Sequence, residues 1–540
     1  MKTLTKKLIA LCLVLCLTLS GCSSIDVMGY FDNLVSIFTG VTAFDRMTYT
    51  RPNMDAFDNA LDEVSTLAAG NDLEALLDGI WAFYDVYDAF NTAYALATIH
   101  YYQDLTDAYW TEEYNFCLEH ISAADAGLDK LYRTLAGSPM RDQLEADEYF
   151  GAGYFDYYDS EGIYDETMME LLEEESAILS RYYALSAEAA GTAYYSEEFF
   201  STYGTPMAEI YLELIALRQQ IADHLGYEDY VQFAYDSYYY RDYTPQQATA
   251  YLADIRAELV PLYTRHLESD FWDQDLASAG EKDTFDYVSS MAQNMGGLIL
   301  EAFQTLEKGK LYDISYGENK YNASFEIYLP SYYEPFVFVN PTLTVFDHLT
   351  FAHEFGHFCS DYASYGSSAG IDVSEILSQS MEYLSLCYAD GGDELTQLKL
   401  SDGLCLYVEQ AALASFEQQV YQLEGSELTV ENVQALYTQV CQAYGMVSEE
   451  WDSRSYVTIT HFFTNPMYIM SYIVSNDAAL QIYQMELEQS GAGVACLESN
   501  LATPHFQLLA FLKEAGLTSP FAGGRLPQVK ALFEEKLLTN

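Results

Sequence analysis

The chain has 540 residues and 50% of them are hydrophobic, which is the composition of a folded protein larger than one compact core. Its 23 Lys and Arg face 82 Asp and Glu, which gives a formal net charge of −59. That charge repels phosphates and anionic lipids, so it excludes a nucleic-acid partner and argues against a polybasic membrane-binding patch.

The N-terminal residues have the pattern of an export signal. Three lysines precede an almost unbroken apolar run at residues 8–19, which is too short to span a bilayer stably. Leu19-Ser20-Gly21-Cys22 then resembles the lipobox of bacterial lipoproteins. The resemblance implies a lipoprotein signal peptide at residues 1–21 and a lipid on Cys22. We therefore expect an extracytoplasmic protein that is lipid-anchored to the bacterial cell membrane through Cys22 alone; the alternative is an ordinary cleaved signal with a chance cysteine.

Most of the remaining chain has the apolar spacing of helices. Apolar residues recur at intervals of three and four over residues 166–189, 206–225 and 245–267. Thr-Pro pairs begin the second and third of these windows, because proline fits the first turn of a helix. The pattern predicts a mostly α protein.

Residues 323–340 differ from the rest of the chain. This stretch is rich in β-branched and aromatic residues, and prolines interrupt it. It predicts two short strands of a small edge sheet, followed by a helix that starts near residues 344–347. An edge strand can pair with the backbone of an extended peptide. The alternative is a structural hairpin with no ligand, and the pattern favours neither.

Two histidines four residues apart, in His353-Glu354-Phe355-Gly356-His357, are the most informative feature of the chain. On a helix they lie on one face, one turn apart, so their imidazoles can converge on one zinc ion. Glu354 lies one step round the helix, within reach of a water molecule that the ion activates. The alternative is a pair of core histidines beside a surface glutamate.

A catalytic zinc takes three protein ligands and keeps one position open for water. The candidates after the histidines are Asp361, Asp372, Glu375 and Glu382. Asp361 would lie a full turn further along the same helix, which is a poor position for tetrahedral coordination. Residues 372–382 predict a second helix, on which Glu375 and Glu382 face the same way because they are seven residues apart.

The histidine motif followed by Asp-x-x-Glu-x-x-Ser-Gln-x-x-Glu at residues 372–382 is similar to the M3 family of zinc oligopeptidases, which includes thimet oligopeptidase and oligoendopeptidase F. The zinc glutamate of the family is the first Glu of the Glu-x-x-Ser-Gln-x-x-Glu stretch. The resemblance therefore implies that Glu375 is a zinc ligand together with His353 and His357. Glu382 matches the second glutamate and is expected to orient a ligand. The gap between His357 and Glu375 is shorter than the family pattern.

A second similarity to the family lies in residues 461–472, where His-Phe-Phe-Thr-Asn-Pro-Met-Tyr-Ile-Met-Ser-Tyr matches His-Phe-x-x-Asn-Pro-x-Tyr-x-Tyr-x-Tyr. In the family, a histidine and tyrosines of this segment contact the substrate and the developing oxyanion. The resemblance implies these roles for His461, Tyr468 and Tyr472. Met470 stands in place of one tyrosine of the pattern. The alternative is that this Tyr-rich helix is only part of the core.

The resemblance thus implies a mostly α, large helical metallopeptidase fold with a deep channel and a small β-sheet beside the zinc helix. It also implies an N-terminal helical region at residues 22–205 and an M3-like zinc peptidase catalytic region at residues 206–540. We expect the chain to bind one Zn²⁺ ion and to act as an endopeptidase on short, unstructured peptides, with water activated by zinc and the Glu354 base. Two alternatives remain: a lipoprotein that binds peptides without cleaving them, and a zinc carboxypeptidase of similar helical fold. The presence of Glu354 argues against the first, because a site that only held a metal would not need a base there.

Overall fold

The computed structural model describes residues 40–538, except residues 148, 160–163, 190–191, 194, 270, 272–274, 368, 448–450 and 502–504. The expected signal peptide and Cys22 lie outside the described residues, so the lipid anchor and the extracytoplasmic location stay predictions. Among the described residues, each helix is too short or too polar to span a bilayer.

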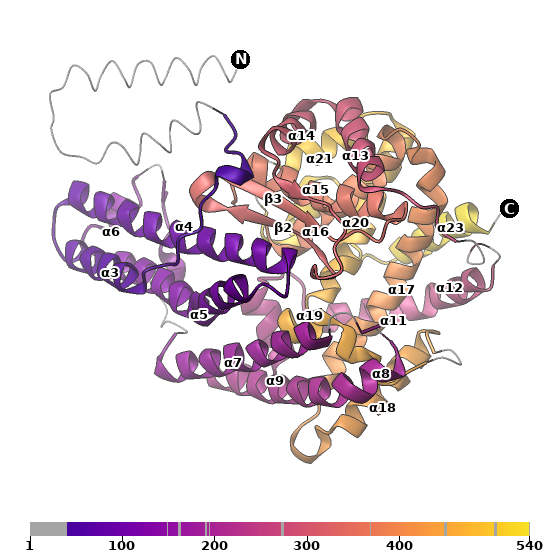
Figure 1. Cartoon of the computed structure of the whole chain (residues 1–540), viewed down its shortest axis with the longest axis horizontal. Helices are drawn as coiled ribbons and strands as arrows, with labels where there is room; N and C mark the ends of the chain where they lie inside the picture. The colour runs from indigo at the N-terminus through magenta and orange to yellow at the C-terminus, as the bar shows by residue number, and fades with distance from the viewer. Residues whose placement is uncertain are drawn as a thin grey trace.

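Three long helices lie side by side at one end of the molecule and share a core of their own (Figure 1). Each begins after an acceptor side chain, because Asn53, Asp72 and Asp107 accept hydrogen bonds from backbone N–H groups of the first turn. The core between the helices includes Phe57 and Phe83, whose ring centres are 5.1 Å apart. These helices are α3 (Met54–Ala68), α4 (Leu73–Gln103) and α5 (Ala108–Ala136), and the short α6 (Arg141–Leu144) follows them.

The second group of helices confirms the three windows predicted from apolar spacing, with two differences. A π turn at Phe200–Gly204 precedes the second window and continues directly into the next helix. Pro206 has no N–H to donate, which favours a wider turn at this point. The third window divides at Leu259, two residues before a proline. The helices are α7 (Glu166–Ala189), α8 (Glu197–Phe199), α9 (Thr205–His224), α10 (Tyr230–Phe233), α11 (Pro245–Glu258) and α12 (Val260–Leu267).

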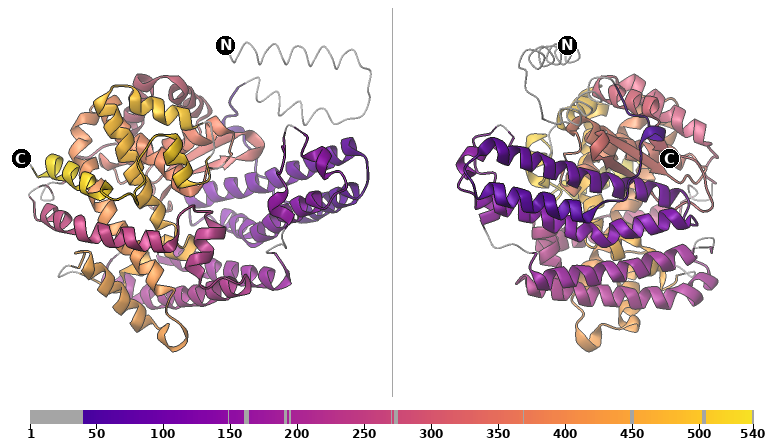
Figure 2. Two further views of the ribbon diagram at one scale, coloured as in Figure 1. Left: turned by 180° about the vertical axis from the view of Figure 1, so that it is seen from behind. Right: turned by 60° about the vertical axis from the view of Figure 1, so that its left-hand side comes forward.

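The C-terminal part of the chain forms the largest core, in which α16 packs between α15 and α20, and α20 packs on α17. Figure 2 shows these helices gathered into the thick half of the molecule, on the far side from α3, α4 and α5. The helices are α13 (Glu281–Met295), α14 (Gly297–Gly309), α15 (Phe346–Ser364), α16 (Ile371–Tyr388), α17 (Thr396–Val420), α18 (Val430–Ala443), α19 (Thr460–Thr464), α20 (Ile469–Glu488), α21 (Ala492–Leu501), α22 (Leu508–Glu514) and α23 (Arg525–Leu537).

A three-stranded sheet packs against α15. Its order is β1 (Tyr312–Asp313), β3 (Glu334–Val339), β2 (Ser324–Leu329). The sequence predicted the two strands β2 and β3, which pair antiparallel with Ser324 opposite Val339. It did not predict β1, which has two residues and is parallel to β3. All six residues of the central strand β3 are buried, whereas β2 is an edge strand and is mostly half-buried.

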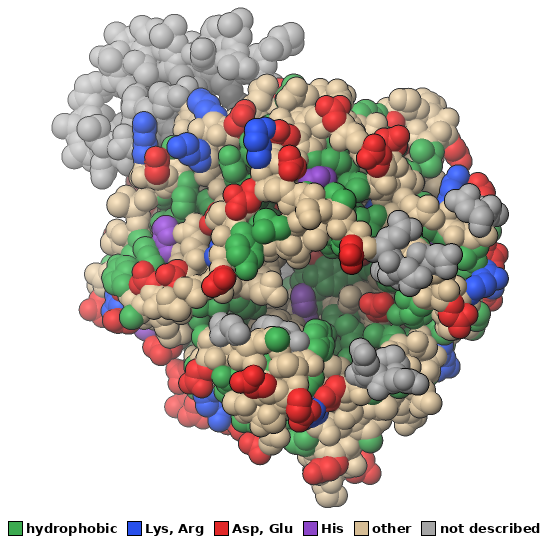
Figure 3. Space-filling view, turned by 45° about the vertical axis from the view of Figure 1, so that its right-hand side comes forward, with side chains coloured by type: hydrophobic (Ala, Val, Ile, Leu, Met, Phe, Trp, Pro, Cys, Tyr) green, Lys and Arg blue, Asp and Glu red, His purple; other side chains and the backbone are tan. Residues whose placement is uncertain are grey.

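One face of the molecule is hollowed (Figure 3). Hydrophobic side chains line the hollow, and a histidine side chain is visible inside it. The fold class predicted from the sequence is therefore confirmed: a mostly helical protein, hollowed on one face, with a small sheet beside the helix that carries the histidine motif.

Candidate metal centre

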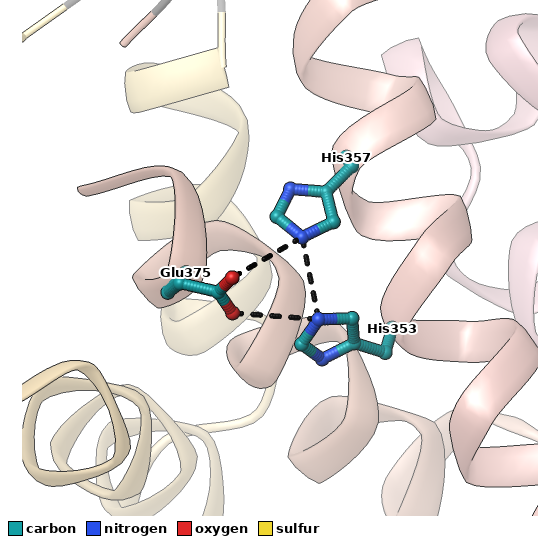
Figure 4. A group of neighbouring side chains, drawn as sticks. All are labelled: His353, His357 and Glu375. Carbon is teal, nitrogen blue, oxygen red and sulfur yellow. Dashed lines mark hydrogen bonds and ion pairs between the residues drawn. The ribbon is translucent and has the colours of Figure 1, made fainter. Parts of the chain in front are cut away.

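Two neighbouring helices bring three ligand-type side chains together (Figure 4). His353 and His357 lie one turn apart on α15, and Glu375 lies in the first turns of α16. One ring nitrogen of each histidine and a carboxylate oxygen of Glu375 lie within 4.8 Å of one another. The structure therefore places the three residues of the predicted ligand set at a single point.

Small residues let the two helices approach closely enough for this contact. A Cβ atom on Gly356, inside the histidine motif, would lie 2.6 Å from the Cα of Ser378 on α16 and 3.2 Å from the Leu377 carbonyl oxygen. Any larger side chain at position 356 would have to push α16 away. No role was predicted for Gly356, although a glycine between the two histidines is a visible signal of close helix packing.

Each imidazole is oriented by a partner on its other nitrogen. His353 Nδ1 lies 2.7 Å from Glu382 Oε1, and His357 Nδ1 lies 3.0 Å from Ser374 Oγ. Both contacts turn the Nε2 atoms toward each other and toward Glu375. Partners of this kind, which fix the tautomer and the ring plane, are typical of histidines that bind a metal. Glu382 takes the place predicted for it, whereas Ser374 was not singled out from the sequence.

The distances among the three donors fit a zinc ion. Tetrahedral ligands about 2.0–2.1 Å from zinc lie about 3.3–3.4 Å from one another. The two Nε2 atoms are 3.3 Å apart, and His353 Nε2 is 3.4 Å from Glu375 Oε2. His357 Nε2 is 3.9 Å from Glu375 Oε1, somewhat longer than the ideal. Two imidazoles and one carboxylate are also the donor set that catalytic zinc takes.

Glu354 is next to the donors but is not one of them. It is only 7% exposed, and among the described residues its carboxylate has no hydrogen-bond partner. Burial raises the pKa of Glu354 to about 7, and the carboxylates of Glu375 and Glu382 add to the rise, while His353 opposes it. A buried carboxylate with free lone pairs and a pKa near neutrality is suited to accept and return a proton.

The pKa values of the donors Glu375 and His357 are shifted in the opposite direction to that of Glu354. Burial by itself would raise the pKa of Glu375, but the hydrogen bond with His353 and the neighbouring His357 and Tyr468 outweigh it and lower the pKa to about 2. Burial lowers the pKa of His357 to about 4, so this imidazole is neutral at pH 7. The ionised Glu375 and the neutral His357 are thus in the forms that bind metal ions. Burial would lower the pKa of His353, but its contacts with Glu375 and Glu382 outweigh it and raise the pKa, so this imidazole must lose a proton when a metal binds.

Three aromatic side chains predicted as substrate contacts cluster beside Glu375. Tyr468 Oη donates a hydrogen bond to Glu375 Oε1 at 2.5 Å, and Tyr472 Oη lies 3.2 Å from His461 Nε2. The ring centres of His461, Tyr468 and Tyr472 are 5.1–5.6 Å apart. Met470, which replaces a tyrosine of the family pattern, is 1% exposed and belongs to the core.

The segment from α19 to the start of α20, which includes His461 and Tyr468, is held by side chains from distant parts of the chain. Arg218 of α9 is 1% exposed and donates to the carbonyl oxygens of Phe462, at 3.1 Å, and Phe463 at the end of α19. Glu417 of α17 accepts a hydrogen bond of 2.9 Å from the backbone N–H of Met467, which has a φ of 67°. These holding residues were not foreseen, because nothing near them in the sequence marks the contact.

The other two candidate ligands lie outside the donor group. Asp361 is one turn beyond His357, where burial raises its pKa to about 6. Asp372 Oδ1 accepts a hydrogen bond from Ser471 Oγ at 2.5 Å and forms an ion pair with Arg241 Nε at 3.4 Å. The structure thus shows which of the candidate acidic residues lie beside the two histidines and which do not. The functional role of each donor is still a prediction.

Comparison with known proteins bears on the fold. Residues 44–161 match the family described as the Peptidase M3 N-terminal domain. No curated protein sequence matches the chain. Among solved structures, a PZ peptidase A is similar to it, with 20% sequence identity, a TM-score of 0.80, and coverage of 92% of this chain and 99% of that one.

Two further structures are an oligoendopeptidase F candidate from Bacillus anthracis str. Ames and an oligoendopeptidase F from Enterococcus faecium. The first has 22% identity, a TM-score of 0.77, and coverage of 92% of this chain and 98% of that one. The second has 15% identity, a TM-score of 0.54, and coverage of 90% of this chain and 97% of that one. The fold is therefore similar to that of the oligoendopeptidase-like helical peptidases, and the helices within residues 44–161 match the model of the M3 N-terminal domain.

Proposed function

We propose that this chain is a zinc-dependent endopeptidase that hydrolyses peptide bonds in short, unstructured peptides. The observation that carries the proposal is the position of His353, His357 and Glu375 at the spacing of tetrahedral zinc ligands, directly beside the unpartnered carboxylate of Glu354. The M3 N-terminal domain match and the oligoendopeptidase fold support the same assignment. No other described cluster of three His, Cys, Asp or Glu residues offers a metal site.

The chemistry follows from the groups around the donors. A zinc ion on His353, His357 and Glu375 would supply Lewis acidity to the scissile carbonyl and lower the pKa of water toward ~7. Glu354 takes the proton from the attacking water and delivers it to the leaving amine. Tyr468 is the hydrogen-bond donor placed nearest to Glu375, so its phenol can turn to the oxyanion that develops beside the ion.

The surroundings of the site fit an extended peptide. His461 and Tyr472 form a second donor pair next to Tyr468. Strand β2 is the edge strand that packs on α15, so the backbone of a peptide can add to it as a further strand. The hollow in Figure 3 is a recess in the surface of the molecule, which suits a flexible chain better than a folded protein. If Cys22 is lipidated, the peptides are cleaved outside the cytoplasmic membrane.

The deciding experiment compares the parent with Glu354→Gln on a quenched fluorescent peptide, both loaded with zinc. We expect Glu354→Gln to keep its fold and its zinc while hydrolysis falls by at least ~10³-fold, because the amide cannot take the proton. An equal rate in both proteins would refute the mechanism. Absence of cleavage products in the parent, by mass spectrometry, would instead indicate a binding protein.

A second substrate separates an endopeptidase from a carboxypeptidase. The same peptide with its amino and carboxyl ends blocked still offers internal bonds but no free C-terminus. We expect the parent to cleave the blocked and the free peptide at similar rates. Loss of cleavage on blocking the carboxyl end would assign the site to a carboxypeptidase.

A further inference from the structure

A buried lysine contacts Glu382, the residue that orients His353 of the candidate metal centre. Lys399 is 0% exposed and lies in the first turn of α17, where both burial and the helix dipole disfavour a cation. Its Nζ donates hydrogen bonds to Glu382 Oε2 at 2.6 Å and to Asp402 Oδ2 at 2.8 Å. It also lies 4.8 Å from the centre of the Tyr383 ring. The lysine is thus held in an unfavourable place by contacts to α16 and to its own helix.

Glu382 uses its two oxygens for two different partners. Oε1 accepts from His353 Nδ1 at 2.7 Å, and Oε2 accepts from Lys399 Nζ at 2.6 Å. Because a carboxylate is rigid and planar, a contact that fixes Oε2 also fixes the place of Oε1. Asp402, Lys399, Glu382 and His353 therefore form one chain of contacts that runs from α17 through α16 to α15.

The two histidines of the metal centre are oriented by different chemistry. The partner of His357 Nδ1 is the hydroxyl of Ser374, which is neutral. The partner of His353 Nδ1 is a carboxylate whose charge is balanced by a buried ammonium group. A free glutamate side chain has several rotamers, and holding it in the one that meets His353 costs conformational entropy. The contact with Lys399 offsets this entropic cost, because it holds Glu382 in that rotamer before any metal binds.

We propose that Lys399 is a positioning residue for the metal centre: by holding Glu382 Oε2 it keeps Glu382 Oε1 on His353 Nδ1, and so keeps His353 Nε2 directed at the metal. The inference rests on the metal site of the proposed function. A purely structural ion pair would stabilise the fold and leave metal affinity unchanged. A positioning residue raises metal affinity, because it fixes the partner that orients a ligand.

The test is the zinc dissociation constant of the full chain, measured by competition with a chelating dye after metal depletion. Lys399→Met keeps most of the apolar stem and removes the cation. Arg525→Met is the matched control, since Arg525 is 4% exposed and pairs with the buried Asp477 at 2.8 Å without touching a candidate ligand among the described residues. We expect Lys399→Met to bind zinc about tenfold more weakly and Arg525→Met to bind it like the parent, although both melt at lower temperature.

Two further variants sharpen this result. Lys399→Arg keeps a cation at the site and should recover part of the zinc affinity, whereas a role in folding alone would predict recovery of the melting temperature only. Asp402→Asn removes a partner of Lys399 that does not touch Glu382, and should weaken zinc binding less than Lys399→Met does. Zinc affinity equal to that of the parent in folded Lys399→Met would overturn the proposal.

A double-mutant comparison decides the question even where Lys399→Met fails to fold. Glu382→Ala removes both oxygens through which Lys399 acts, and adding Lys399→Met then leaves no carboxylate at position 382 without a partner. We expect Glu382→Ala and the double variant to bind zinc with the same affinity. A further loss of affinity in the double variant would show that Lys399 acts by another route. A parent protein that binds no zinc would refute the metal centre itself, which is a different outcome.

Discussion

Tyr468 donates a hydrogen bond of 2.5 Å to Glu375, so the phenol that we assign to the oxyanion is already bonded to a proposed metal ligand. The contact joins α20 to α16, which places the donor and the ligand in one rigid unit. It also lowers the pKa of Glu375 together with the contacts of His353 and His357, after burial has acted to raise it. One side chain therefore affects both the binding of the metal and the chemistry.

The variant Tyr468→Phe separates these two effects. It removes the phenolic oxygen and keeps the ring that packs beside His461. Loss of one oxyanion donor lowers kcat by about 10²–10³-fold, whereas loss of one neutral hydrogen bond to a ligand changes zinc affinity far less. We expect the rate defect to persist at saturating zinc, in steady-state kinetics with a quenched peptide. Recovery of the full rate on adding zinc would show that Tyr468 serves metal binding alone. Tyr472→Phe is the comparison, because its hydroxyl contacts His461 and not a ligand.

Gly356 offers a test of the close approach between α15 and α16. An alanine Cβ there would lie 2.6 Å from the Ser378 Cα, a backbone atom that cannot turn aside. We expect Gly356→Ala to force the helices apart, lower the free energy of unfolding by about 1–3 kcal/mol, and weaken zinc binding because Glu375 moves with α16. Calorimetry and the chelator competition measure the two effects. The control is Gly523→Ala, since an added Cβ at residue 523 meets no atom within 4 Å. Unchanged zinc affinity in folded Gly356→Ala would contradict this account.

The sequence could predict what depends on local spacing. His353 and His357 share a face because four residues make about one helical turn, and the same periodicity predicted the helices around residues 166–189 and 245–267. The strands β2 and β3 were visible as β-branched and aromatic runs ended by proline. Their places within the sheet, with the two-residue β1 beside β3, depend on pairing across the chain and were not visible.

Contacts between distant segments could not be predicted in this way. Asp372 and Glu375 were both open as ligands, and the difference between them lies in Arg241, which is 131 residues away from Asp372 in sequence and pairs with it. Lys399 is a further example, because a lysine in a helical window is normally taken as a surface residue. Only the crossing of α17 over α16 buries it against Glu382. The resemblance to a family predicted Glu375 as a ligand. The side chains that surround Glu375 come together only through packing between distant segments.

Removal of the metal should lower the thermal stability of the parent. A ligand that binds only the folded state stabilises it, by about 2.7 kcal/mol at a concentration one hundred times its dissociation constant. We expect the parent to melt at a lower temperature in a chelator, and excess zinc to restore both the melting temperature and peptide hydrolysis. Glu375→Gln loses a charged ligand, so its melting temperature should respond less to zinc at the same concentration. A parent whose melting temperature and activity ignore chelator would contradict the zinc assignment.

Glu417 should make the stability of the protein depend on pH. It is 1% exposed, and burial raises its pKa from 4.5 to about 8, while the hydrogen bond from Met467 and the charges of Arg218 and Arg241 oppose the rise. The folded state therefore keeps this proton to higher pH than the unfolded state does. The sign follows: stability is lost progressively as pH rises from about 4.5 to about 8, by up to ~1.4 kcal/mol per pH unit.

The variant Glu417→Gln isolates this contribution, because its amide oxygen can still accept from the Met467 N–H while the side chain no longer titrates. We expect the melting temperature of the parent to fall relative to that of Glu417→Gln between pH 5 and pH 8 in scanning calorimetry. The exposed Glu431→Gln on α18 is the control and should follow the parent. Parallel pH profiles of the parent and Glu417→Gln would mean that Glu417 is already ionised at pH 5.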